Sequence, residues 1–235
     1  MESIILNTSR RFIKVFLIAA TAILASLFSP AAFAHGHPHP PQPPPDTCRL
    51  LVVGFTGGTE APDWDSSGVV QIRYRLQNLH QPGLCVHTFS AYYWWLSKAW
   101  VRERFGATAD EQLTPEQIAK GPKVIIYGHS FGGWATMSLA RDLQAQGIPI
   151  ELTVQMDSIG ITDRTVPPNV KEAANYYERQ TFVLQGRGRI HAHDKKKTKI
   201  LGNYKLDGYV HYNISRSPQI SDLIVNKAQA IYEDP

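Results

Sequence analysis

This chain of 235 residues has few cysteines, a small net charge and few long apolar runs. The only cysteines are Cys48 and Cys85, and neither belongs to a Cys-x-x-Cys pair or a histidine spacing typical of zinc ligands. Charged residues make up 19% of the chain and the formal net charge is +4, too balanced to indicate a nucleic-acid partner. Beyond the N-terminal region, no apolar segment has the length of a membrane span. These shortages argue against a cysteine-ligated metal site, nucleic-acid binding and a later membrane span.

The first 34 residues have the pattern of a secretory signal peptide. Three basic residues at positions 10, 11 and 14 precede an apolar stretch over residues 15–28, and Ala32-Phe33-Ala34 fits a small-x-small cleavage site. The apolar stretch is shorter than the ~20 residues that a membrane-spanning helix needs, so we predict cleavage after Ala34 and not an anchor. The mature protein is therefore expected to be secreted or periplasmic, with no stable membrane span.

Residues 35–47 are rich in histidine and proline and are expected to form an extended spacer before a folded domain over residues 48–235. Cleavage after Ala34 would expose His35-Gly36-His37, whose amine, amide and imidazole nitrogens could chelate Cu(II) or Ni(II). The composition favours the alternative, an unstructured leader. We therefore predict no metal site and no cofactor.

The rest of the chain alternates apolar, strand-like runs with helix-compatible runs. Strands are predicted over residues 49–54, 84–88, 123–127, 148–156, 181–185 and 198–203. Helices are predicted over residues 66–79, 91–105, 131–146, 169–179 and 218–232, with another beginning at Thr114-Pro115-Glu116. This alternation predicts an α/β fold, a compact and mostly parallel sheet with helices on both faces and no large lid domain.

The two cysteines fall at the first two predicted strands. If those strands are neighbours in the sheet, Cys48 and Cys85 can approach closely enough to pair, and an export route allows them to do so. We predict a disulfide; two separate buried thiols are the alternative.

The clearest signal for chemistry is Gly128-His129-Ser130-Phe131-Gly132, which has the pattern G-x-S-x-G. An apolar strand leads into it and a helix-compatible run follows, which is the context that this pattern needs. A serine on such a sharp turn is lifted clear of the sheet and lies near the N–H groups of the helix. Gly128, Gly132 and Gly133 have a steric reason to be glycine, because larger side chains would collide with the strand or the helix. An incidental serine in a glycine-rich turn is the alternative.

On these residues the chain resembles the α/β-hydrolase superfamily, in particular its lipase, esterase and thioesterase branch. The resemblance rests on Gly128–Gly133 and extends, less specifically, to the order of elements from Cys48 onwards. It implies a Ser–acid–His triad in that chain order, with Ser130 as the nucleophile.

Chain order then selects the base and the acid. His211 follows the last predicted strand and precedes the last helix, where the superfamily carries its histidine, so we predict it as the general base. Asp157 ends an apolar strand at the carboxyl edge of the sheet and is the predicted acid. This early position is similar to that in thioesterase domains of peptide synthetases, whereas many esterases carry the acid one strand later. Asp194 is that later alternative, but it lies among lysines in a predicted solvated loop.

The oxyanion hole is expected to use the backbone N–H of Phe131 and that of Phe55 or Thr56, although no full His-Gly-Gly-Gly signature is present. An aromatic cluster could line an acyl pocket or pack in the core: Phe89, Tyr92, Tyr93, Trp94, Trp95 and Trp100. A basic run could attract an anionic substrate or form a solvated loop: Arg187, Arg189, Lys195, Lys196, Lys197 and Lys199.

The sequence thus predicts an exported serine hydrolase that cleaves a carboxylic ester or thioester through an acyl-enzyme. Its substrate would be a small molecule or a lipid. An acyltransferase with the same triad and a non-catalytic binding protein on a hydrolase scaffold are the two alternatives.

Overall fold

A computed structural model of the chain describes residue 44, residues 47–107 and residues 112–233. The predicted signal peptide, most of the predicted spacer and the His35-Gly36-His37 hypothesis lie outside these residues. In the ranges that are described, no helix combines the length and the apolar character needed to cross a membrane.

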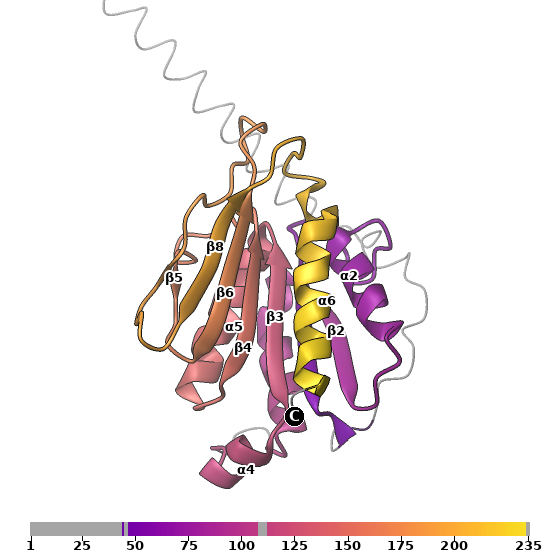
Figure 1. Cartoon of the computed structure of the whole chain (residues 1–235), viewed down its shortest axis with the longest axis vertical. Coiled ribbons are helices and arrows are strands. Elements are labelled where there is room, and N and C mark those ends of the chain that lie inside the picture. Colours follow the sequence, from indigo (N-terminus) through magenta and orange to yellow (C-terminus); the bar gives the residue numbers. More distant parts are fainter. Residues whose placement is uncertain (1–43, 45–46, 108–111, 234–235) are drawn as a thin grey trace, which may run out of the picture. The chain divides into compact units, whose positions relative to one another are not determined.

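The centre of the fold is a six-stranded sheet in the order β2 (Leu84–Ser90), β1 (Leu50–Thr56), β3 (Lys123–His129), β4 (Ile150–Met156), β6 (Val170–Tyr177) and β8 (Lys199–Lys205). Each neighbouring pair is parallel. Two short parallel strands, β5 (Thr165–Val166) and β7 (His191–Ala192), form a separate small sheet. The carboxyl ends of the six strands meet at one edge, the upper edge in Figure 1.

Helices cover both faces of this sheet. Helices α2 (Gly68–Gln77) and α6 (Pro218–Glu233) contact each other on one face, whereas α3 (Trp94–Arg104) and α5 (Phe131–Ala145) contact each other on the opposite one. The short helix α4 (Pro115–Lys120) lies at the lower end (Figure 1). Because both faces are covered, all seven residues of β1 are buried, as expected for a central parallel strand. The predicted α/β fold with helices on both faces is confirmed.

Two local predictions are wrong. Residues 169–179 were expected to be a helix but contain β6, and residues 181–185 were expected to be a strand but form a loop. Strand β6 lies between β4 and β8 and pairs with both, so sheet hydrogen bonds and burial outweigh the local helix preference of its glutamate and alanines. In the loop, Phe182 is 95% exposed and Val183 is 84% exposed, so their apolar character does not reflect a buried strand.

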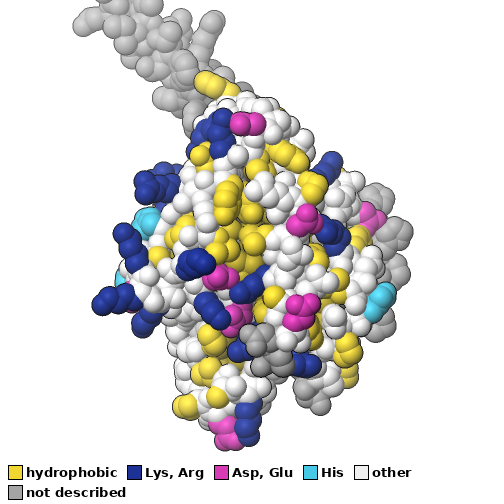
Figure 2. Space-filling model, in the orientation of Figure 1, with side chains coloured by type: hydrophobic (Ala, Val, Ile, Leu, Met, Phe, Trp, Pro, Cys, Tyr) yellow, Lys and Arg dark blue, Asp and Glu magenta, His cyan; other side chains and the backbone are white. Residues whose placement is uncertain are grey.

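As a result, the connections from β4 to β6 and from β6 to β8 contain no helix, and both lie entirely within the described residues. Helix α6 reaches β6 through an ion pair in which Lys227 Nζ lies 2.9 Å from Glu172 Oε2. On the face of the molecule that carries α6, Figure 2 shows apolar side chains in the middle with charged side chains around them.

The predicted disulfide is present between Cys48 and Cys85, whose Cα atoms are 5.8 Å apart. Cys48 lies two residues before β1, and Cys85 is the second residue of β2. Strands β1 and β2 are neighbours and run parallel, so the bridge joins their amino ends. It therefore lies at the opposite edge of the sheet from the carboxyl ends.

Candidate active site

Ser130 is the single residue between β3, which ends at His129, and α5, which begins at Phe131. Its backbone has φ 59° and ψ −122°, a strained conformation for a residue other than glycine. The Ser130 N–H donates to the carbonyl of Met156, 2.9 Å away, at the end of the neighbouring strand β4. The turn therefore holds the serine side chain at the carboxyl edge of the sheet.

Glycines make this tight turn sterically feasible. A Cβ atom on Gly128 would lie 2.1 Å from the carbonyl oxygen of Gly132, and a Cβ on Gly132 would lie 2.2 Å from that of Phe55. A Cβ on Gly133 would lie 2.5 Å from Cβ of Ser158. Each of these neighbours is backbone or rigidly attached to it, so the steric reason expected for the three glycines holds.

A hydrogen-bonded chain of three side chains leads away from this turn. Ser130 Oγ lies 2.9 Å from His211 Nε2, and His211 Nδ1 lies 2.6 Å from Asp157 Oδ2. The three residues are buried, with exposed fractions of 5%, 3% and 0% for Ser130, His211 and Asp157. The structure thus brings the predicted nucleophile, base and acid together. Asp194 instead accepts a hydrogen bond from the N–H of Lys196 in a turn.

Asp157 is held firmly at the end of β4. Its backbone has a positive φ of 45°, and its N–H donates to the carbonyl of Tyr176 at 2.7 Å. Its Oδ1 accepts hydrogen bonds from the N–H groups of Glu178 at 3.3 Å and Gly186 at 3.1 Å. These two donors leave Oδ2 to face His211.

The backbone of His211 is fixed at both its polar groups. Its N–H donates to Thr181 Oγ1 at 2.9 Å, and its carbonyl oxygen lies 2.7 Å from His129 Nε2. The sequence analysis assigned no role to Thr181 or to the side chain of His129. The only local signal for His129 was its place beside the nucleophile.

The turn that follows β1 lies against the nucleophile. A Cβ atom on Gly57 would be 3.4 Å from Cβ of Ser130, and the Gly57 N–H already donates to Glu60 Oε2 at 3.3 Å. Phe55 and Thr56 are the last two residues of β1, and Phe131 is the first residue of α5, where a backbone N–H has no partner within the helix. The three predicted oxyanion residues therefore lie at the same edge as Ser130.

The predicted aromatic cluster divides into two parts. Phe89 is buried against Trp100, with ring centroids 6.1 Å apart, and belongs to the core. Tyr92 instead lies near Phe131, at 6.3 Å between ring centroids, and burial raises its pKa. Phe131, Tyr93 and Trp95 are exposed. Thus Tyr92 is a member of the cluster that lies near Phe131, the residue after the serine.

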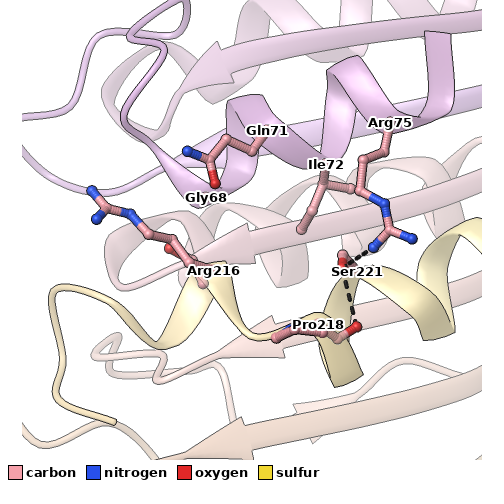
Figure 3. A pocket seen from close by; sticks show the side chains of 8 residues that line it. Gly68, Gln71, Ile72, Arg75, Arg216, Pro218 and Ser221 are labelled. Atoms are coloured by element: carbon pink, nitrogen blue, oxygen red, sulfur yellow. Dashed lines mark hydrogen bonds between the residues drawn. The ribbon is translucent and has the colours of Figure 1, made fainter. Parts of the chain in front are cut away.

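A separate cavity of about 220 Å³ lies between α2 and α6 (Figure 3). Its lining residues are Gly68, Gln71, Ile72, Arg75, Ser215, Arg216, Pro218 and Ser221. Arg75 donates to Ser221 and pairs with Asp222 at 2.8 Å, and Arg216 donates to the carbonyl of Ser66 at 2.7 Å. Both guanidinium groups are thus already engaged. Across the residues that the structure describes, no three His, Cys, Asp or Glu side chains form a group able to hold a metal ion.

No family model and no curated protein matches the sequence. Solved structures with similarity include the RedJ thioesterase from the prodiginine biosynthetic pathway in Streptomyces coelicolor, at 12% identity and a TM-score of 0.45, covering 89% of this chain and 95% of that one. The NocB thioesterase domain, in covalent complex with a fluorophosphonate nocardicin G analogue, is 12% identical with a TM-score of 0.44, covering 80% and 96%. A structure of the metagenome-derived lipolytic enzymes LipS and LipT has the same identity and TM-score, covering 80% and 95%. At this level of similarity, the chemistry of this chain has to be argued from its own site.

Proposed function

We propose that the chain is a serine hydrolase that cleaves a carboxylic ester or thioester. The observation that carries the proposal is the hydrogen-bonded chain from Ser130 through His211 to Asp157. The distance of 2.9 Å between Ser130 Oγ and His211 Nε2 lies within the range for direct proton transfer. Asp157 accepts from the other ring nitrogen, which leaves the Nε2 lone pair of neutral His211 directed at the serine hydroxyl.

In the proposed reaction, Ser130 Oγ attacks the carbonyl carbon of the substrate and His211 Nε2 takes the hydroxyl proton. The negative charge that develops on the carbonyl oxygen is stabilised by the N–H of Phe131 and that of Phe55 or Thr56. The C–O or C–S bond then breaks, and His211 returns the proton to the departing alcohol or thiol. A water molecule, deprotonated by His211, hydrolyses the acyl-enzyme and releases the acid.

The surroundings of Ser130 favour an apolar acyl group. Phe131 follows the nucleophile directly and is 39% exposed, and Tyr92 lies beside it. Aromatic side chains at the entrance of a site bind apolar groups through burial of area. A small-molecule or lipid ester is therefore the proposed substrate class. Export is part of the proposal and is supported by the N-terminal pattern and by the disulfide.

The proposal is tested on mature protein, residues 35–235, with chromogenic esters and thioesters of increasing acyl length. Ser130→Ala should lower kcat by about 10⁴-fold or more. Ser138→Ala is the matched control, because this hydroxyl lies on α5, the helix that follows Ser130, and donates to the carbonyl of Trp134 at 3.1 Å. A fluorophosphonate should add once, at Ser130.

Activity that persists in Ser130→Ala, or labelling at another residue, would contradict the proposal. Ligand binding by wild type without turnover would favour a non-catalytic binding protein. Product partitioning toward added alcohols in preference to water would favour an acyltransferase.

A further inference from the structure

His129 is a buried histidine that the proposed mechanism does not use. It directly precedes Ser130 on the chain, and its ring contacts the backbone of His211. Its Nε2 lies 2.7 Å from the His211 carbonyl oxygen, across a sequence separation of 82 residues. The two imidazole rings are 5.0 Å apart between centroids. His129 thus joins the nucleophile turn to the loop that carries the base.

The direction of this hydrogen bond is set by chemistry. A carbonyl oxygen can only accept, so His129 Nε2 carries the hydrogen and donates it. His129 is 3% exposed, and burial is the main reason why its pKa is lowered from 6.5. The nearby Glu60 and Asp157 carboxylates raise that pKa but do not outweigh burial and the neighbouring His211. A neutral His129 does not repel the imidazolium that forms on His211 during the proposed reaction.

The other side of the His129 ring faces the turn that follows β1. Its Nδ1 lies 3.9 Å from Glu60 Oε1, while Glu60 Oε2 accepts from the N–H of Gly57 at 3.3 Å and from Ser67 Oγ at 2.8 Å. A Cβ atom on Gly57 would lie 3.2 Å from His129 Nδ1. The ring therefore lies between the turn that follows β1 and the carbonyl of His211.

We propose that His129 is a positioning residue, whose Nε2–H holds the His211 carbonyl and thereby sets the distance between the His211 ring and Ser130 Oγ. Thr181 holds the N–H of the same residue at 2.9 Å. The hydrogen bond from His129 to the His211 carbonyl ties His211 to β3, the strand that ends just before the nucleophile. The effect on turnover rests on the proposed function, whereas the effect on geometry does not.

The test compares His129→Met, which keeps much of the volume but cannot donate, with His129→Gln, whose amide reaches toward the Nε2 position and can donate. In His129→Met we expect kcat to fall on the order of 10²-fold with little change in KM, since a displacement of about 1 Å can cost that much. His129→Gln should restore most of the loss. Thr153→Val is the matched control, since its buried hydroxyl on β4 has no hydrogen-bond partner among the described residues.

A second readout needs no turnover. The Nδ1–H of His211, bonded to Asp157 at 2.6 Å, should give a proton NMR signal far downfield of the amides, assigned by its loss in Asp157→Asn. We expect it to shift or broaden in His129→Met and to remain in His129→Gln and Thr153→Val. If wild type hydrolyses no ester or thioester, the proposed function fails, and this signal alone decides the role of His129.

Equal kcat values in the Met and Gln variants, or an unchanged downfield signal in His129→Met, would overturn the inference. Circular dichroism and thermal unfolding verify that each variant is folded. Should His129→Met not fold, His129→Asn replaces it, because its shorter amide cannot reach the His211 carbonyl, and the same comparison with His129→Gln applies.

Discussion

Asparagine in place of Asp157 should reverse the tautomer of His211. Asp157 Oδ1 accepts from the N–H groups of Glu178 and Gly186, so an asparagine has to keep its oxygen on that side. Its NH₂ group, which can only donate, then faces His211 Nδ1. His211 has to present a lone pair at Nδ1 and carry its hydrogen on Nε2, toward Ser130. In that form it cannot accept the serine proton.

The size of the loss follows from this switch. Glu178, Gly186 and the backbone bond from Asp157 N–H to the Tyr176 carbonyl at 2.7 Å remain in place, so we expect the fold to be kept. The charge that stabilises the imidazolium is lost together with the reactive tautomer. We therefore expect kcat to fall by about 10⁴-fold, equivalent to about 5 kcal/mol of transition-state stabilisation.

The assay is ester hydrolysis by the folded variant across the chromogenic panel, with Asp194→Asn as the control. The Asp194 side chain accepts a hydrogen bond from the N–H of Lys196, at 2.9 Å, in a turn, so its variant should keep wild-type kcat. A kcat within tenfold of wild type for Asp157→Asn would refute the reasoning. A larger loss for Asp194→Asn would also refute it and would favour Asp194, one strand later, as the acid.

Three further predictions concern the bridge, the loop around Asp157 and the buried histidine. The double variant Cys48→Ala/Cys85→Ala should lose about 3–4 kcal/mol of unfolding free energy in urea titrations, from the loop-entropy relation for a separation of 37 residues, with kcat unchanged. An unchanged urea midpoint would contradict this. Gly186→Ala would place Cβ 2.4 Å from Asp157 Oδ1, so kcat should fall on the order of tenfold or more. A kcat equal to that of wild type would show that the loop can move without displacing Asp157. Because burial lowers the pKa of His129 below 6.5, the unfolded chain binds a proton that the native protein does not, and unfolding free energy should decrease as pH falls below 6.5. His129→Gln should make this decrease shallower, and equal slopes would argue against a buried neutral histidine.

The parts of the fold that were predictable are those where local pattern and burial agree. The apolar run before Ser130 is a central strand. A Cβ atom on any of the three glycines of the turn would lie 2.1–2.5 Å from a neighbouring atom. The strand pattern and the glycines therefore located the turn from the sequence. The disulfide between Cys48 and Cys85 was also predictable, because each cysteine falls at one of the first two predicted strands and these strands are neighbours in the sheet.

Strand β6 shows where local pattern misleads. Its sequence, Val-Lys-Glu-Ala-Ala-Asn-Tyr-Tyr, contains good helix formers. Its strand state depends on pairing with β4 and β8, which were themselves predicted as strands but whose pairing with this segment the local pattern does not reveal. In the site, Asp157 and His211 were found from chain order. The contacts of Thr181 and His129 with the His211 backbone depend on loop conformation, for which the sequence carries no periodic signal.

The loop connections of β6 have a consequence for how the site comes apart. Ser130 follows β3, one of the strands that are joined through helices. Asp157 and His211 instead follow strands at the β4–β6–β8 side of the sheet, where the connections between strands contain no helix. Regions with exposed loops open locally at a lower free energy than a packed core. Local opening of that side would separate the acid and the base from the serine while the central strands stay folded. We therefore expect mild denaturant to abolish turnover reversibly before tryptophan fluorescence changes, because Trp94, Trp100 and Trp134 pack against the core.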